Sequence, residues 1–136
     1  MNNLTKSEFM KIYNEGKNLT DKPIFIKFHA TWWGPCKMYE QVLNEVTPEY
    51  SSKVSLYEVN IEQEPEIAGL FGVRSVPTTT TISKGGDIFS QPGVINKDTL
   101  KYFLEGLISK KKKKSLTYIA ILIYIIGKKK NRLYGS

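Results

Sequence analysis

The sequence predicts an α/β fold, with a mixed central sheet of about four strands and helices on both faces. The first observation is the order of the predicted elements, which is α, β, α, β, α, β, β, α. The second is the run Pro23 to His29, which is too short for a helix and apolar on nearly all sides. Such a run is typical of a central strand, covered on both faces.

The N-terminal third should contain one helix and that strand. Thr5 and Glu8 have the spacing of a capping box, and Leu4 and Phe9 have that of a hydrophobic staple. We expect this helix to end near Gly16 and a turn to follow over residues 18–22. In the strand of residues 23–29, Lys27 is the one charge among apolar residues.

The middle third predicts a helix, a strand and a short helix. Apolar residues at helical spacing place the first helix over 37–46, ending at about 47–48; these are Met38, Val42, Leu43 and Val46. A strand is expected over 54–61 and a short helix over 66–71. Residues 72–77 then form a loop.

The C-terminal part of the domain predicts a hairpin and a last helix. A threonine-rich strand over 78–83 and a strand over 88–91 flank the turn at 84–87. The hydroxyls of the threonines require partners if they face inward, and the sequence leaves open whether this core is weak or the face meets something else. Asn96 or Asp98 caps a helix with an apolar face of Leu100, Phe103, Leu104, Leu107 and Ile108.

Charge divides the chain into a domain, residues 1–109, and a tail, residues 110–136. Residues 1–109 contain 11 of the 20 Lys and Arg and all 13 acidic residues, so the domain has a net charge of −2. The other nine basic residues lie in the tail, which has a net charge of +9. The single cysteine excludes an intramolecular disulfide and a zinc site built on several thiolates. No cofactor or metal is expected. The N-terminus lacks the apolar core of a signal peptide, so we expect a cytoplasmic domain.

The candidate site is the turn from Thr31 to Lys37, which joins the central strand to a helix. Unpaired backbone amides and the helix dipole stabilise negative charge at such a helix N-terminus. A cysteine there, here Cys36, would ionise more easily. A redox pair would need a second cysteine three residues earlier, but that position holds Trp33.

From about Phe25 to Leu107 the chain resembles the thioredoxin family. The motifs are W-W-G-P-C-K at 32–37 against the family's W-C-G-P-C-K, V-N-I-E at 59–62, G-V-R-S-V-P-T at 72–78, K-G-G at 84–86, and Gly93. The resemblance implies the thioredoxin fold, a role in cell redox homeostasis and a cis proline at Pro77 beside the active turn.

Three positions depart from the family's pattern. Trp33 stands where the family has its attacking cysteine, and Cys36 matches the resolving cysteine, which then has no mixed disulfide to resolve. Lys27 stands where the family has a buried acid, and Glu58 stands where the family has an accompanying lysine. The exchange predicts a buried ion pair with its charges swapped and without a proton acceptor. His29 replaces a bulky aromatic residue; it could act as a base for Cys36 or pack under the turn with a hydrogen bond to backbone.

Two functions follow from these departures. The first is a redox-impaired binder of extended peptide or protein clients, since the family pairs such a segment with the backbone before the cis proline. Its expected contact residues are Trp32, Trp33, Gly34, Pro35, Val76, Pro77 and Gly93. The alternative is a thiol-disulfide oxidoreductase whose attacking cysteine is altered in this copy, because Cys and Trp codons differ by one base. A third reading is a residual one-cysteine chemistry, such as glutathionylation of Cys36.

The tail lies outside the resemblance. Five lysines, residues 110–114, precede an uncharged apolar run, Leu116 to Ile126, and three more lysines follow it. As a helix, residues 115–127 would be roughly 20 Å long, short of the about 30 Å core of a bilayer. We expect residues 110–130 to associate with a membrane surface; docking on the domain or on a second copy, and aggregation, are the alternatives. No nucleic-acid partner is expected, because such a run does not track phosphates.

Overall fold

The computed structural model describes residues 1–31 and 34–109. Its helices are α1 (Lys6–Ile12), α2 (Gly34–Val46), α3 (Pro65–Leu70) and α4 (Lys97–Ser109), and a short 3-10 helix, η1 (Thr47–Tyr50), follows α2. Its strands are β1 (Asn2–Asn3), β2 (Tyr13–Asn14), β3 (Lys17–Asn18), β4 (Ile24–His29), β5 (Ser55–Asn60), β6 (Thr78–Ile82) and β7 (Ile88–Pro92). The expectations for Trp32, Trp33 and residues 110–136 lie outside the described residues.

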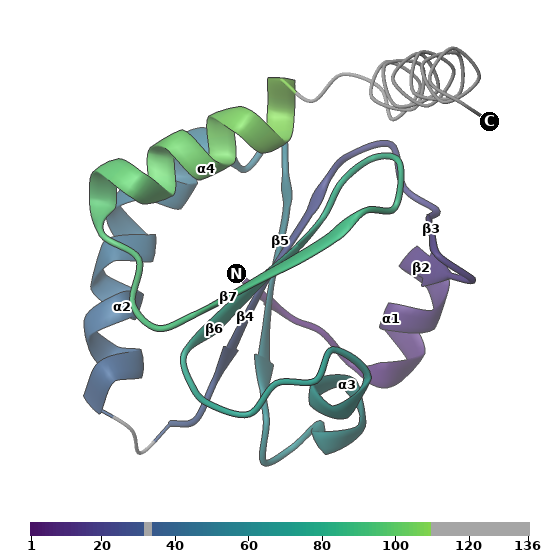
Figure 1. The fold of residues 1–136 in the computed structure, drawn as a ribbon, viewed down its shortest axis with the longest axis horizontal. Coiled ribbons are helices and arrows are strands. Elements are labelled where there is room, and N and C mark those ends of the chain that lie inside the picture. The colour runs from purple at the N-terminus through teal and green to yellow at the C-terminus, as the bar shows by residue number, and fades with distance from the viewer. Residues whose placement is uncertain (32–33, 110–136) are drawn as a thin grey trace, which may run out of the picture.

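Strand β4 is the centre of the sheet, as its apolar sequence predicts. The five strands lie in the order β1-β5-β4-β6-β7. In Figure 1, α2 and α4 lie on one side of this sheet and α1 and α3 on the other. Strand β4 runs parallel to β5 and antiparallel to β6, and β7 is antiparallel to β6. The register places Lys27 between Glu58 of β5 and Thr79 of β6.

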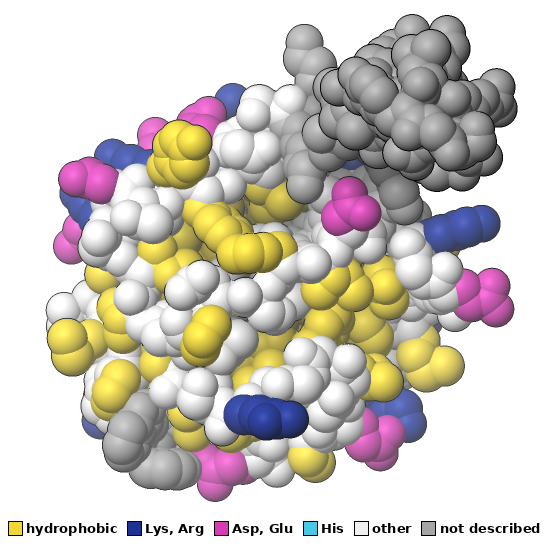
Figure 2. All heavy atoms as spheres, in the orientation of Figure 1, with side chains coloured by type: hydrophobic (Ala, Val, Ile, Leu, Met, Phe, Trp, Pro, Cys, Tyr) yellow, Lys and Arg dark blue, Asp and Glu magenta, His cyan; other side chains and the backbone are white. Residues whose placement is uncertain are grey.

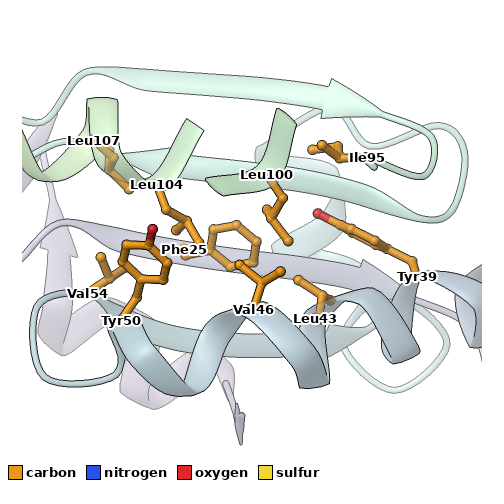
Figure 3. Packing of buried hydrophobic residues seen from close by; sticks show 10 residues of the cluster. All are labelled: Phe25, Tyr39, Leu43, Val46, Tyr50, Val54, Ile95, Leu100, Leu104 and Leu107. Carbon is orange, nitrogen blue, oxygen red and sulfur yellow. The ribbon is translucent and has the colours of Figure 1, made fainter. Parts of the chain in front are cut away.

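Helices cover both faces of this mixed sheet, and alternation along β4 feeds a separate core on each. Phe25 packs with residues of α2 and α4, including Leu43, Val46, Leu100 and Leu104 (Figure 3). Ile24, Ile26 and Phe28 pack on the other face with Leu4, Phe9 of α1 and Ile67 of α3. Lys27 and His29 alternate with Ile26 and Phe28, so they lie on the face that α2 and α4 cover.

Two of the predicted helix caps are present. The backbone N–H of Glu8 donates to Thr5 Oγ1 over 3.2 Å, and Leu4 and Phe9 are both buried in the same cluster. At α4, Asn96 is the cap of the two candidates, because its Oδ1 accepts from the N–H of Thr99 over 2.9 Å.

The N-terminal region differs from the prediction. Helix α1 ends at Ile12 rather than near Gly16, and β2 and β3 form a small hairpin. The helix ends because its C-cap, Tyr13, is extended. The turn of the hairpin needs the left-handed conformations of Glu15 and Gly16, with φ of 49° and 77°, which glycine favours. A fifth strand, β1, also joins the sheet beside β5; with two residues it is too short to show periodicity.

The β2–β3 hairpin touches a second turn far away in the sequence. A Cβ atom added to Gly86, in the turn between β6 and β7, would collide with the carbonyl oxygen of Gly16. Asn18 supports the same contact, because its Nδ2 donates to the carbonyl of Ser83 over 3.2 Å. The described part of the chain contains no helix that is both long and apolar enough to cross a membrane.

Candidate functional site

Cys36 lies in the first helical turn of α2, which begins at Gly34. Thr31 is the last residue before α2 that the structure describes. The residue is buried, with 5% of its surface exposed. Pro35 precedes it and is partly buried. The thiol that the sequence places at a helix N-terminus is therefore on the inner side of the helix, where access to a large disulfide substrate is limited.

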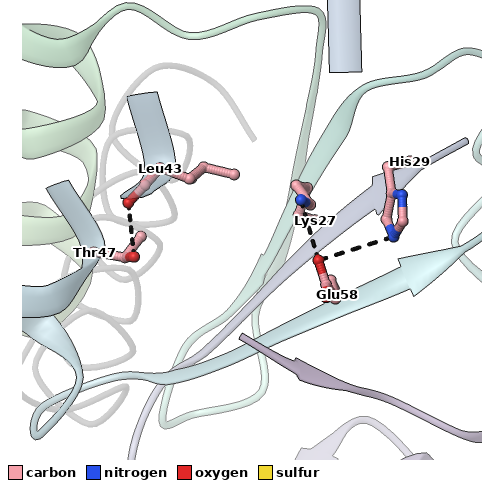
Figure 4. A network of polar contacts seen from close by, with 5 residues as sticks. All are labelled: Lys27, His29, Leu43, Thr47 and Glu58. Carbon is pink, nitrogen blue, oxygen red and sulfur yellow. Dashed lines mark hydrogen bonds and ion pairs between the residues drawn. The ribbon is translucent and has the colours of Figure 1, made fainter. Parts of the chain in front are cut away.

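The predicted charge pair is present behind the turn. Lys27 Nζ lies 3.1 Å from Glu58 Oε2 (Figure 4), and the exposed fractions of the two side chains are 5% and 26%. Direct register between β4 and β5 brings them together. A buried ammonium requires a partner, which Glu58 supplies, and an ammonium group has no lone pair with which to accept a proton.

His29 extends this pair toward the end of β4. Its Nε2 lies 3.9 Å from Glu58 Oε2 (Figure 4) and has no hydrogen-bond partner among the described residues. The expected backbone hydrogen bond is therefore absent at Nε2 within the described part of the chain. Burial and then the charge of Lys27 lower the pKa of His29 from 6.5, against the opposing effects of Glu58 and Glu40. A role for His29 as a base for Cys36 stays a prediction.

Tyr39 and Thr79 form a polar contact that the sequence prediction missed. The hydroxyl of Tyr39 and Thr79 Oγ1 lie 2.6 Å apart, and both residues are fully buried. Burial raises the pKa of Tyr39 to about 12, although the hydrogen bond with Thr79 opposes this. The phenol is therefore neutral near pH 7. It joins α2, one turn beyond Cys36, to the strand position beside Lys27.

Three of the four threonine hydroxyls of β6 have hydrogen-bond partners, although this does not decide between a weak core and a face that meets something else. Besides Thr79, Thr80 Oγ1 lies 2.8 Å from Ser90 Oγ, and Thr78 Oγ1 donates to the carbonyl of Ser75 over 2.8 Å. All four threonines of β6 are buried. Because buried hydroxyls with partners incur little desolvation penalty, threonine here is compatible with a closed core.

The second part of the site is the loop before β6. The Val76–Pro77 peptide bond is cis, as the resemblance implies. Gly93, with φ of 90°, donates its N–H to the carbonyl of Pro77 over 2.8 Å. No backbone partner of the Val76 N–H or C=O is present among the described residues. Thr78 pairs with Phe28, so this loop lies at the end of β4 that leads into the turn.

The structure therefore brings together Lys27, Glu58 and His29 by register, and Val76, Pro77 and Gly93 around one loop. Gly34, Pro35 and Cys36 begin α2. Trp32 and Trp33 lie outside the described residues. Tyr39 had a sequence signal that we did not use: it follows Cys36 by three residues and precedes Leu43 by four. Met38, which we assigned to the apolar stripe, is instead 63% exposed.

This arrangement can do only one-thiol chemistry, because the chain has one cysteine. Within the residues that the structure describes, no group of three His, Cys, Asp or Glu side chains could hold a metal ion. The sheet order, the cysteine at the N-terminus of α2 and the cis proline before β6 together define the class of thioredoxin-fold domains.

Comparisons with known proteins lead to the same class. The family model described as Thioredoxin matches residues 1–106. A thioredoxin of Haemophilus influenzae is 39% identical over 85 residues, covering 62% of this chain and 79% of the relative. One from Rickettsia felis is 34% identical over 99 residues, covering 73% of this chain and 90% of the relative. The chain belongs to the thioredoxin family.

Solved structures agree on the fold. The crystal structure of a Malassezia sympodialis thioredoxin, 27% identical, aligns with a TM-score of 0.64 and covers 76% of this chain and 85% of that chain. Chloroplastic thioredoxin z, 17% identical, has the same TM-score and covers 78% of this chain and 92% of that chain, which shows the fold alone.

Proposed function

We propose that this protein binds extended protein or peptide segments beside Val76 and Pro77 and is impaired in dithiol-disulfide exchange. The observation that carries the proposal is the contrast between the two halves of the site. The only thiol, Cys36, is buried and has no second cysteine to work with. In contrast, the N–H and C=O of Val76 are without partners among the described residues, and these are the groups that strand addition requires.

In recognition of this kind, hydrogen bonds to the backbone of the client provide most of the affinity. Gly93, which has no side chain and is exposed, leaves room beside Pro77 for an extended segment. Trp32 and Trp33 supply an aromatic rim in this proposal, and Gly34 and Pro35 the floor of the turn. Protein clients on the cytoplasmic side are the expected partners, as for thioredoxins.

A peptide experiment tests the binding. Fluorescence anisotropy would follow a short labelled Val/Thr peptide, and the control is the same peptide with alternate amides N-methylated on the edge that meets Val76. We expect the methylated peptide to bind at least about tenfold more weakly, because each lost backbone hydrogen bond is worth about 1 kcal/mol and methyl groups also clash. Equal affinities of the two peptides would contradict backbone pairing.

An insulin-reduction assay with dithiothreitol tests the redox half of the proposal. We expect the protein and its Cys36→Ser variant to be indistinguishable, because no mixed disulfide can be resolved without an attacking cysteine. Turnover by the protein well above that of Cys36→Ser would overturn it.

The second candidate is an oxidoreductase that has lost its attacking cysteine at position 33. The relatives named thioredoxin and the retained G-P-C turn favour it. Trp33→Cys should then restore strong insulin reduction, whereas an inert variant would count against this candidate. Because Lys27 replaces the family's buried acid, we expect the restored protein to have an altered pH profile.

We further propose that residues 110–136 form a tail separate from the domain of residues 1–109, and that residues 110–130 bind a membrane surface. The sequence supports this with lysines on both sides of an uncharged run, since each lysine near an anionic surface contributes about 1 kcal/mol. The full chain should co-sediment with anionic vesicles, and a chain truncated after Ser109 should not. Equal partitioning of the two would end this proposal.

A further inference from the structure

Strand β7 ends the sheet within the described part of the chain, and its outer edge is open. All five of its residues are exposed. Ser83 donates to the carbonyl of Asp87 at one end of the β6–β7 pair, and Gly93 to that of Pro77 at the other. Because hydrogen-bonded pairs alternate along antiparallel strands, Phe89 and Gln91 bond inward to β6. Ile88 and Ser90 therefore direct their N–H and C=O groups outward.

Within the described residues, Pro92 is the one protective feature of this edge. Natural edge strands carry charged residues, bulges or a covering element, which prevent pairing with another strand. Residues 88–96 contain no charge, and Ile88 and Phe89 are 47% and 50% exposed. Pro92 is at an outward-facing position and has no N–H, so it limits pairing to the first half of the strand.

An apolar hollow lies next to the same edge. It has a volume of about 440 Å³ between β7 and α4, and its lining consists of Thr81, Phe89, Phe103, Gly106, Leu107 and Ser109. The rings of Phe89 and Phe103 lie 5.3 Å apart between centroids. Figure 2 shows hydrophobic side chains gathered on this face. A strand added beside β7 would therefore find both hydrogen-bonding groups and apolar surface.

The protein's own tail is a poor occupant for this edge. Strand β7 is parallel to β4, and α4 covers the same face as α2. Helix α4 ends beside the start of β7, since Ser109 and Phe89 line the same hollow. A strand that continued directly from Ser109 would run parallel to β7, and the step from β7 to it would go away from β4, whereas the β4-α2-β5 crossover steps the other way along the sheet. That connection would be left-handed, whereas about 98% of the connections between two parallel strands of one sheet are right-handed.

We propose that the edge binds a second copy of this chain, with the two β7 strands antiparallel about a two-fold axis. In the fitting register Ile88 lies opposite Ser90 of the partner subunit. Both outward-facing residues then exchange their backbone hydrogen bonds, and neither bond requires the N–H of Pro92. Phe89 faces the partner's Phe89 at the axis, which is the close, non-hydrogen-bonded pair.

Charge also fits a symmetric pair. In this register Asp87 lies opposite Gln91 of the partner subunit, so no like charges oppose each other along the strand. An isologous two-fold contact is the commonest form of self-association. The dimer joins two five-stranded sheets into one and places Phe89 of each copy between the two hollows.

Sedimentation velocity of the full chain tests this proposal through position 89. We expect a dimer for the unaltered protein and half that mass for Phe89→Lys and for Phe89→Glu, because each variant sets two like charges together at the axis. An equimolar mixture of the two variants should restore the dimer mass, since Lys then faces Glu. Tyr102→Lys is the matched control: Tyr102 is 83% exposed on α4, and this variant should remain dimeric.

Three results would overturn the proposal. A monomeric unaltered protein would do so, and so would a mixture of Phe89→Lys and Phe89→Glu that stays monomeric. Oligomers that persist in Phe89→Lys would place the contact elsewhere, for instance in the tail. Circular dichroism melts of each variant establish that it is folded. A dimer in the equimolar mixture would show the same, because unfolded variants could not pair.

Discussion

The two faces of the central sheet differ in charge: the α1 and α3 face is built on an apolar cluster, whereas the α2 and α4 face carries the Lys27–Glu58 ion pair near the site. On the α1 and α3 face, Ile26 and Phe28 of β4 pack in an apolar cluster, and the polar neighbours that the register gives them are the threonines Thr80 and Thr78 of β6. On the α2 and α4 face, the apolar cluster around Phe25 gives way to Lys27 and Thr79. The first face stabilises the fold, and the second combines packing with the charges behind Cys36. Mutations on neighbouring residues of β4 can separate these contributions.

The largest effect is expected on the apolar face. Ile26 is fully buried, so Ile26→Ala removes buried methyl and methylene groups and leaves a cavity. We expect the free energy of unfolding to fall by about 2 to 5 kcal/mol, measured by urea denaturation. The insulin assay and peptide affinity should not change under conditions where the variant is folded. A loss below about 1 kcal/mol would show that the α1 and α3 face can collapse around the cavity.

The next effect is on the charge pair. Glu58→Gln leaves Lys27 buried without a counter-charge, and we expect a loss of about 2 to 3 kcal/mol in the free energy of unfolding, because Glu58 is partly exposed. The control is the double variant Lys27→Met with Glu58→Gln, which removes the buried charge as well. It should recover most of the loss. A double variant as unstable as Glu58→Gln alone would contradict the ion-pair explanation.

A smaller effect is expected at the contact between α2 and β6. Tyr39→Phe removes one partner of the 2.6 Å hydrogen bond and leaves the hydroxyl of Thr79 buried. We expect about 1 to 2 kcal/mol of destabilisation by urea denaturation. Adding Thr79→Val replaces both polar groups with apolar ones of similar shape, and it should restore stability to within about 0.5 kcal/mol. If the loss in the double variant equalled the sum of the losses in Tyr39→Phe and in Thr79→Val alone, this would argue against a direct contact.

The smallest effect is a pH dependence at His29. Its pKa lies below 6.5 in the folded protein, so between these two values the unfolded chain binds a proton that the folded chain does not. The free energy of unfolding contributed by His29 is therefore fully present above about pH 6.5 and falls as the pH decreases through that window. Urea denaturation at about pH 7.5 and about pH 5.5 measures this difference. His29→Phe should reduce it, and an unchanged difference would assign it to other groups.

Most of the fold could be predicted because its elements have strong local signals. The apolar run around Phe25 identified the central strand, Thr5 marked one helix start, and Asn96 and Asp98 were the two candidates for another. The β2–β3 hairpin could not be predicted in this way, since each strand has two residues and its turn depends on a positive φ at Glu15. Strand β1 is defined only by its pairing with β5, far away in the sequence.

The site shows the same division. The pairing of Lys27 with Glu58 followed from the resemblance and from alternation along two strands. The contact between Tyr39 and Thr79 depends on how deep α2 lies over β6, which no local pattern encodes. Likewise, the missing partner of His29 Nε2 within the described residues is a property of three-dimensional packing.

The contact between Gly86 and Gly16 has a consequence for local opening. The turn between β6 and β7 and the turn between β2 and β3 are in van der Waals contact, without room for a methyl group between them. Neither turn can therefore move toward the other while that one stays in place, and the hydrogen bond from Asn18 Nδ2 to the carbonyl of Ser83 resists their separation. In hydrogen exchange, the amides of the two hairpins should report one shared opening event, so that a short N-terminal hairpin and the far edge of the sheet belong to a single cooperative unit.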